Sequence, residues 1–145
     1  MTTGTYPIQA HAVKIGHHIL IEEHPCRISA VSHHKTGKHG HAKCGLAGYC
    51  LVQACTSRHE TMCAGHLLLQ AFHPTREEFQ VCSIEPPTTL TIFKADGNID
   101  TLDLADKALM KAYTQNPDAG DYWVTVLSFP YKDDLHKRLV AWKVI

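Results

Sequence analysis

The residues Thr88-Thr-Leu-Thr-Ile-Phe-Lys-Ala-Asp-Gly-Asn-Ile-Asp-Thr-Leu-Asp-Leu104 set the architecture of the second half of the chain. Thr88–Lys94 is rich in β-branched residues, which favour a strand. Asp96-Gly97 is a strong hairpin signal, because a two-residue turn of this kind needs positive φ at its central positions. Ile99–Leu104 returns as the partner strand. These residues therefore predict an antiparallel hairpin.

A helix and three more strands surround this hairpin. Ala105–Gln115 consists mainly of good helix formers, and its apolar residues recur at i, i+3, i+4 and i+7: Ala105, Ala108, Leu109 and Ala112. Asn116-Pro117 ends the helix. The remaining strands are expected at Phe79–Ile84, Tyr122–Phe129 and Leu135–Ile145, with Pro130 separating the last two. The order β-β-β-α-β-β fits a five-stranded oligonucleotide-binding (OB) barrel.

The first half of the chain shows short strand patterns and no helical periodicity. Strands are expected at Ile8–Val13, His18–Glu22, Cys26–Ser32, Lys43–Gln53 and Met62–Phe72. Leu67-Leu68-Leu69 also fits a buried helical turn, and periodicity alone does not decide. Several short strands predict a small barrel or sandwich. The polar, proline-containing stretch at His73–Pro74 predicts the boundary between two domains.

Composition describes an ordinary globular protein of 145 residues, 44% hydrophobic and 19% charged. No apolar run approaches the roughly 20 residues needed to span a bilayer, and the N-terminus has no signal-peptide pattern, so we expect a cytoplasmic protein. The zero net charge is unevenly distributed. Six basic residues face three acidic ones up to Phe72, whereas eight face eleven from His73 onward. The basic half is the one expected to meet a polyanion.

The six cysteines include no C-x-x-C pair. In a reducing cytosol such scattered cysteines are usually small buried apolar groups, so we expect neither disulfides nor a zinc site from them. No nucleophile–base pair is evident either. We therefore expect a protein without catalytic residues, metal or cofactor, and with histidines that are mostly polar surface groups.

The most unusual segment is Lys35-Thr36-Gly37-Lys38-His39-Gly40-His41-Ala42-Lys43, which lies between two predicted strands. It holds three lysines, two histidines, two glycines and no acidic residue. Glycine adopts backbone angles closed to other residues, so the chain can turn tightly on both sides of Lys38. The segment is expected to present one long cationic side chain at a loop tip, with flanking lysines that attract phosphates.

A segment of this composition has three other possible interpretations: a P-loop, a metal site and a solvated basic loop. A P-loop requires G-x-x-x-x-G-K-[ST]; here Gly37-Lys38 lacks the upstream glycine and is followed by His39, so this interpretation fails. A metal site at His39-x-His41 or His33-His34 lacks a cysteine or carboxylate in the loop. A solvated basic loop is the default for a run of this composition.

All nine positions from Lys35 to Lys43 resemble the modification loop of the eukaryotic translation initiation factor 5A family. The resemblance extends along the chain in the family's order, at Tyr6-Pro7-Ile8-Gln9, Pro25-Cys26-Arg27-Ile28, Glu78-Phe79-Gln80-Val81 and Val124-Thr125-Val126-Leu127-Ser128. Departures include the nearly absent acidic N-terminal arm and Ser57-Arg58-His59-Glu60-Thr61 in place of the family's Ser-Thr-His-Asn.

The resemblance implies a fold and a function. It implies an SH3-like barrel over residues 1–73 that carries the loop, and an OB domain over residues 74–145. It implies that Lys38 becomes hypusine, through deoxyhypusine synthase with spermidine as donor and then deoxyhypusine hydroxylase. Lys35, Thr36, Gly37, His39, Gly40, His41, Ala42 and Lys43 would serve modification and contacts with peptidyl-tRNA and ribosomal RNA on the ribosome.

Two hypotheses thus follow from the sequence. The first is a translation factor that promotes peptide-bond formation at slow junctions through modified Lys38. The second is a standalone RNA-binding SH3/OB module without hypusine. In the OB domain, Tyr131-Lys132 and Lys137-Arg138 are the pairs expected to face RNA, whereas most aromatic residues are expected to pack in the core.

Overall fold

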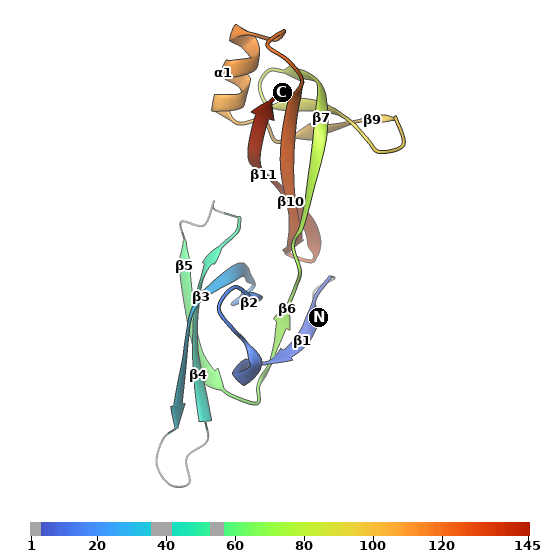
Figure 1. Ribbon diagram of the computed structural model, residues 1–145. Helices are drawn as coiled ribbons and strands as arrows, with labels where there is room; N and C mark the ends of the chain where they lie inside the picture. Colours follow the sequence, from blue (N-terminus) through green and yellow to red (C-terminus); the bar gives the residue numbers. More distant parts are fainter. Residues whose placement is uncertain (1–3, 36–41, 53–56) are drawn as a thin grey trace. The chain divides into compact units, whose positions relative to one another are not determined.

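The computed structural model describes residues 4–35, 42–52 and 57–145. Its backbone contacts group into two compact units (Figure 1). The first unit comprises Met1–Pro74 with Phe129–His136, and the second comprises Thr75–Ser128 with Lys137–Ile145. The division into functional domains at residues 1–73 and 74–145 stays a prediction. In the described part of the chain, no helix is long and apolar enough to cross a membrane.

The first unit is built on one antiparallel sheet. Its elements are β1 (Tyr6–Gln9), the 3-10 helix η1 (Ala10–Ala12), β2 (His18–Ile21), β3 (His24–Lys35), β4 (Ala42–Cys50), β5 (Arg58–Ala64) and β6 (Leu68–Ala71). The strand order is β1-β6-β2-β3-β4-β5. β3 and β4 form the long hairpin of this sheet (Figure 1).

Alternating side chains build the core of the first unit. In β2, Ile19 and Ile21 are buried while His18 and Leu20 are half-buried, as expected when successive residues point to opposite faces. The buried cluster joins residues from the strands and from the segment before β2: Val13, Ile19, Ile21, Cys26, Ile28, Leu46, Cys50 and Ala71.

Two predicted strands in this unit are wrong in extent. The strand expected over Ile8–Val13 ends at Gln9, because the N–H groups of Ala10 and His11 bond to the carbonyls of Leu67 and Gly65, and the chain curls around buried Ala10. The single strand expected over Met62–Phe72 is the end of β5 followed by all of β6. A turn separates them, closed by the bond from the Leu67 N–H to the Ala64 carbonyl.

The helical-turn alternative at Leu67-Leu68-Leu69 is also wrong. Leu68 and Leu69 belong to β6 and pair with Gln9 and Ile8 of β1. The side chain of Leu68 is 62% exposed, so this apolar run is not a buried turn.

The second unit is built on a five-stranded antiparallel sheet and one helix. Its elements are β7 (Thr75–Glu85), β8 (Thr89–Phe93), β9 (Ile99–Asp103), α1 (Lys107–Gln115), β10 (Tyr122–Tyr131) and β11 (Asp134–Val144). The end of β10 and the start of β11, within Phe129–His136, group with the first unit. The strand order is β11-β10-β7-β8-β9. The core of this unit includes Leu90, Ile92, Leu109 and Val124, all at most 2% exposed. The predicted hairpin around Asp96-Gly97 is confirmed by the β8–β9 pairing.

The helix begins later than its composition predicts. The Ala105 N–H bonds to the Thr88 carbonyl and so stays with the end of the sheet. Asp106 then caps the helix, because its Oδ1 accepts a hydrogen bond of 2.7 Å from the Leu109 N–H. Of the predicted apolar face, Ala105 and Leu109 are buried, while Ala108 is exposed.

Pro130 does not separate the last two strands, contrary to the sequence prediction. It lies inside β10, which continues to Tyr131. The chain reverses at Lys132-Asp133, where φ is 50° and 62°. Two consecutive positive φ values are the geometry of a tight two-residue hairpin turn. The predicted mainly β fold, an SH3-like unit and an OB unit with one short helix, is otherwise confirmed.

His18 is a half-buried histidine in β2. Its ring lies against Phe72, with centroids 5.5 Å apart, and it is paired in register with Arg27 of β3. Burial, followed by the positive charges of Arg27, His73 and His17, lowers the pKa of His18 from 6.5 to about 4.

We predict that His18 makes the first unit acid-sensitive. Its unfolded-state pKa is higher than its folded-state pKa, so between about pH 6.5 and pH 4 the unfolded chain binds a proton that the folded chain does not. The free energy of unfolding should therefore fall as the pH drops through this window. In urea titrations at several pH values, His18→Gln should flatten that fall, whereas His66→Gln, at an exposed position, should not. Equal pH dependence in His18→Gln and wild type would contradict the prediction.

Candidate functional site

The predicted loop is mounted on the end of the β3–β4 hairpin. β3 ends at Lys35 and β4 begins at Ala42, and these two residues are register partners. The next pair is His34 with Lys43. Lys38 and its neighbours Thr36, Gly37, His39, Gly40 and His41 lie outside the described residues. The structure thus places the base of the loop, a regular antiparallel ladder from the Ala30–Ala47 pair to the Lys35–Ala42 pair, with exposed Lys43 near its end.

A third strand supports this base. β4 lies between β3 and β5, and Lys43 is paired with Ala64 of β5. The Gly65 N–H donates a hydrogen bond of 2.9 Å to the carbonyl of Ala42, the first residue of β4. Both edges of β4 are therefore paired with neighbouring backbone at the end of the strand that adjoins residues 36–41.

The histidines at the base do not form a joint site. His33 and His34 are consecutive strand residues, so their side chains point to opposite faces. His33 Nδ1 lies 3.6 Å from the Cys44 sulfur, and His34 Nε2 lies 3.1 Å from the Ser32 hydroxyl. The metal site considered for His33-His34 is therefore not formed by this pair.

The Cys63 thiol near this base is not activated. Burial raises the pKa of Cys63, and its partner Cys44 raises it further. A raised pKa keeps the thiol protonated and weakly nucleophilic. Four of the described cysteines, namely Cys44, Cys50, Cys63 and Cys82, are free thiols.

Close backbone approach shapes the hairpin. β3 carries a bulge between Ile28 and Ala30, and bulges bend and twist a strand. Opposite this bend lies Gly48, where an added Cβ would be 2.5 Å from the Arg27 carbonyl oxygen. Only glycine fits here without backbone movement. Gly45, nearer the loop, would instead meet the Ser32 hydroxyl at 2.4 Å.

The second unit offers a groove with an acidic rim. About 650 Å³ of space lies over the β7–β8–β9–β10 surface, with Phe79, Phe93 and Trp123 in its lining. Its charged lining residues are four carboxylates and two lysines: Glu77, Glu78, Asp96, Asp100, Lys94 and Lys137.

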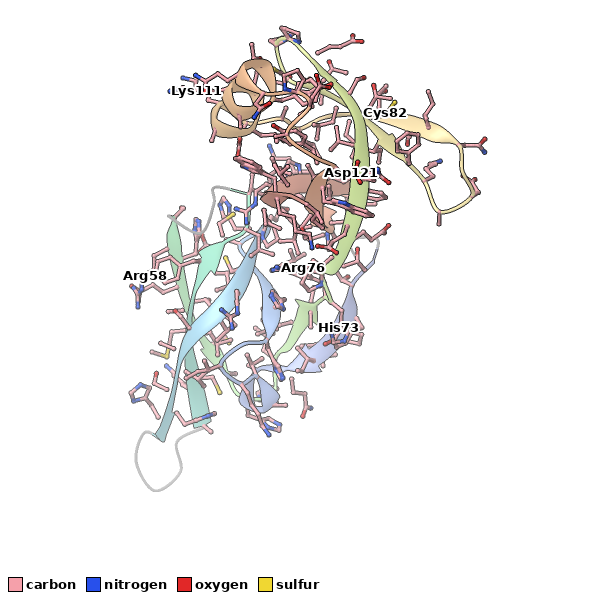
Figure 2. The ribbon with its side chains drawn as sticks, turned by 45° about the horizontal axis from the view of Figure 1, so that its top comes forward. Arg58, His73, Arg76, Cys82, Lys111 and Asp121 are labelled. Atoms are coloured by element: carbon pink, nitrogen blue, oxygen red, sulfur yellow. The ribbon has the colours of Figure 1, made fainter. Side chains whose placement is uncertain are left out.

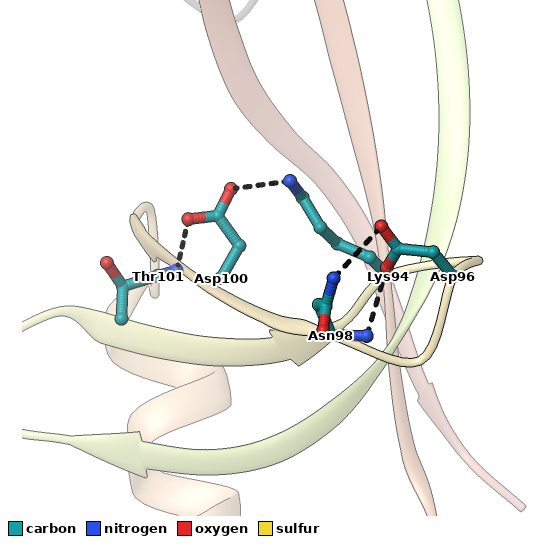
Figure 3. Close-up of polar contacts among 5 residues, drawn as sticks. All are labelled: Lys94, Asp96, Asn98, Asp100 and Thr101. Atoms are coloured by element: carbon teal, nitrogen blue, oxygen red, sulfur yellow. Dashed lines mark hydrogen bonds and ion pairs between the residues drawn. The ribbon is translucent and has the colours of Figure 1, made fainter.

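One of those lysines is paired with a carboxylate beside the β8–β9 turn. Figure 3 shows Lys94 Nζ directed at Asp100, 4.0 Å from its Oδ2. Asp96 accepts hydrogen bonds from the N–H and side-chain amide of Asn98, at 2.9 and 3.2 Å, and the backbone bond is the main reason that the pKa of Asp96 is lowered. Glu78 is paired with Lys143 at 3.3 Å, so the groove keeps only a small excess of negative charge, which disfavours a phosphate backbone.

The residue pairs expected to face RNA differ in their surroundings. Lys132 Nζ lies 5.2 Å from the centre of the Tyr131 ring, a cation–π distance. Arg138 is half-buried, and its Nε and Nη1 have no hydrogen-bond partner in the structure. Tyr122 and Phe129 are buried, as expected for core aromatics. Figure 2 shows exposed basic side chains elsewhere, among them Arg76 and Lys111.

The protein is therefore a small protein of two antiparallel β units. A lysine- and glycine-rich segment joins the two strands of the long hairpin in the first unit. The family profile "Translation initiation factor 5A-like, N-terminal" matches residues 3–66. Eukaryotic translation initiation factor 5A from Zea mays is 33% identical over 127 residues, 86% of this chain and 78% of the relative. The chain belongs to the eukaryotic translation initiation factor 5A family.

Other relatives agree with this assignment. The factor 5A of Spodoptera exigua is 30% identical over 97 residues, 67% of this chain, and the match spans 59% of that relative's length. The solved structure of a translation initiation factor eif-5a family protein from Naegleria fowleri superposes with a TM-score of 0.82 at 29% identity, covering 98% of this chain and all of that one. The similarity therefore covers both units.

We predict that Gly48 is required for the hairpin geometry. Gly48→Ala should lower the free energy of unfolding by about 1–3 kcal/mol, the usual range for overpacking, because the added methyl group meets backbone. Gly45→Ala is the matched control on the same strand: the Ser32 side chain can rotate away, so its cost should be smaller. Chemical denaturation measures both. An equal or larger loss for Gly45→Ala would contradict the prediction.

Proposed function

We propose that this protein binds the ribosome beside peptidyl-tRNA and promotes peptide-bond formation at slow junctions, in elongation and termination, through a hypusine at Lys38. The observation that carries the proposal is the match of all nine residues from Lys35 to Lys43 to the family's modification loop. Family membership and the attachment of the loop to the end of the β3–β4 hairpin support it. The protein would act in the cytoplasm, with the ribosome performing the chemistry.

The hairpin gives a physical reason for choosing Lys38. Deoxyhypusine synthase must take one lysine amine into its own pocket, and Gly37 and Gly40 remove side-chain bulk on both sides of it. The ladder that ends at Lys35 and Ala42 would hold the loop away from the body of the sheet. Deoxyhypusine hydroxylase would then complete the side chain.

Charge supports ribosomal RNA and tRNA as partners of the first unit. Lys35, Lys38 and Lys43 bring three positive charges to the loop and its base without a carboxylate between them. Each phosphate contact adds affinity that decreases with salt. The acidic rim of the groove in the second unit disfavours the same partner there. We therefore assign the RNA-facing role to residues 1–73 and keep residues 74–145 as a separate domain.

The extended side chain would act by positioning. Hypusine is a long arm with two amines, which can enter a narrow RNA-walled space and hold the acceptor end of peptidyl-tRNA. Good positioning of reactants can contribute up to about 7–11 kcal/mol in favourable systems. A slow proline-rich junction needs only a fraction of this free energy.

We predict a spermidine-derived modification on Lys38 alone among the lysines. Peptide mass spectrometry of the protein purified from its native cells should find the added mass on the peptide containing Lys38, and not on peptides containing Lys14 or Lys111. Bacterial recombinant protein serves as the unmodified reference. An unmodified Lys38 in growing native cells would leave the standalone RNA-binding module as the remaining hypothesis.

We predict that Lys38→Arg abolishes stimulation of translation while keeping the fold. Arginine keeps the charge but cannot accept the aminobutyl group. In reconstituted translation of a proline-run message, modified wild-type protein should raise the yield and Lys38→Arg should not. Lys111→Arg, the same change at an exposed helix position, is the control and should stimulate fully. If Lys38→Arg stimulates as well as wild type, the proposed mechanism is wrong for this chain.

A further inference from the structure

Three metal-ligating side chains meet at the end of the β3–β4 hairpin that is opposite to the loop. His24 begins β3, Cys50 ends β4 and His59 lies in β5. One ligand atom from each of them lies within 4.8 Å of the others. These residues lie far apart in the sequence, and their spacing matches no metal-binding motif.

The backbone holds the three positions together. β4 lies between β3 and β5. The Cys50 N–H donates to the Ser57 carbonyl at 2.8 Å, toward the β5 side, and the Leu51 N–H donates to the Pro25 carbonyl at 2.8 Å, toward the β3 side. The cluster is thus built on adjacent strands of one sheet, which position ligands more precisely than loops do.

The side chains differ in exposure in a way that suits a metal site. Cys50 is 2% exposed, so its sulfur belongs to the unit's interior. His24 and His59 are half-buried and stack on one another, with ring centroids 3.9 Å apart and planes inclined by 17°. Because the two imidazoles are partly exposed, an ion can reach the cluster from solvent.

Ser57 can orient one of the imidazoles. Its hydroxyl lies 2.9 Å from His59 Nε2. If Nε2 carries the hydrogen and donates it to the hydroxyl oxygen, Nδ1 keeps its lone pair for a metal. Metal-binding histidines commonly use their second nitrogen in this way.

The charged neighbours of His59 do not compete for the same space. Arg58 and Glu60 alternate with His59 along β5, so their side chains lie on the other face of the strand. They form an ion pair with each other, and Figure 2 shows Arg58 projecting away from the sheet. No ammonium or guanidinium from these two positions repels a cation at the cluster.

We propose that His24, Cys50 and His59 bind a zinc ion. One thiolate and two imidazoles are ligands that zinc prefers, with Zn–S near 2.3 Å and Zn–N near 2.0–2.1 Å. A tetrahedral ion would hold such atoms about 3.3–3.6 Å apart, so small side-chain rotations from the present spacing complete the set. The fourth position is left for water. Binding replaces the Cys50 S–H bond by a Zn–S bond and releases that proton to solvent.

The ion would fasten the ends of three strands at a point remote from Lys38. His24 and Lys35 are the two ends of β3, roughly 35 Å apart along an extended strand. The site would therefore stabilise the hairpin from its far end without touching the loop. The sequence predicts no metal here, because these ligands lie far apart in the chain.

Cobalt substitution tests the proposal, because a Co²⁺–thiolate bond has its own charge-transfer absorption. Full-length protein, reduced and stripped with a chelator, should take up one Co²⁺ per chain with this absorption, and one equivalent of Zn²⁺ should displace it. Cys50→Ala should abolish the absorption. His59→Phe preserves the ring stack on His24 but removes a ligand, and it should weaken Zn²⁺ binding by more than the roughly 10–100-fold typical of losing an outer partner.

The Cys44–His33 pair supplies the matched controls. Cys44→Ala and His33→Phe remove a thiol and an imidazole that lie 3.6 Å apart on the same hairpin, outside the cluster. Both variants should keep the cobalt absorption and the Zn²⁺ affinity of the wild type. Zn²⁺ should also raise the melting temperature of wild type and Cys44→Ala, but not of His59→Phe.

Three results would overturn the proposal. The first is a wild-type protein that binds Co²⁺ without the thiolate absorption, which would place the ion on surface histidines, of which the chain has many. The second is equal Zn²⁺ affinity in wild type and His59→Phe. The third is uptake of Cu⁺ but not Zn²⁺ by the same residues, which would rule out zinc as the ion.

Discussion

The antiparallel pairing of β3 with β4 is the constraint on which the first unit depends. It runs from Cys26 opposite Cys50 to Lys35 opposite Ala42. Ladder hydrogen bonds fix the register, and a slip of one residue would turn every side chain to the other face. Such a slip would expose Ile28 and Leu46, now 1% exposed each. The same strand register therefore determines both the packing of the core and the pairing of the residues at the base of the loop.

This pairing places chemically different groups at the two ends of the hairpin. The end at Lys35 and Ala42 carries the lysine loop, and the end at Cys26 and Cys50 adjoins the histidine–cysteine cluster. The lysines of the loop and the side chains of the histidine–cysteine cluster therefore belong to opposite ends of the hairpin. In the second unit the groove rim is rich in carboxylates, so its charge has the opposite sign from that of the lysines in the loop.

Local sequence predicted the elements whose signals are local. Asp96-Gly97 needed no distant partner to specify a turn, and the composition of α1 was sufficient for a helix. The first residue of α1 was misplaced because the bond from Ala105 to Thr88 joins residues far apart in the sequence. The sequence predicts a break at Pro130, whereas the chain reverses through two positive φ values at Lys132-Asp133, residues without the usual glycine. Tertiary pairing overrode local preference at both sites.

The candidate sites divide in the same way. The lysine loop is a continuous segment, so the sequence alone identified it by composition and by resemblance. The cluster of His24, Cys50 and His59 exists only after β3, β4 and β5 align, and each residue taken singly looks like an ordinary surface histidine or core cysteine. A search for sequence-adjacent ligands could not find it.

The alternation on β5 has a consequence for the behaviour of the protein at high concentration. β5 stands at the end of the sheet order, where the backbone of an outermost strand can template pairing with another chain. Arg58 and Glu60 put charges along that strand, while Met62, 57% exposed, continues the same face without one. The half of β5 that holds Arg58 and Glu60 is thus guarded against intermolecular strand addition. The Met62 half is where self-association during expression or storage would begin.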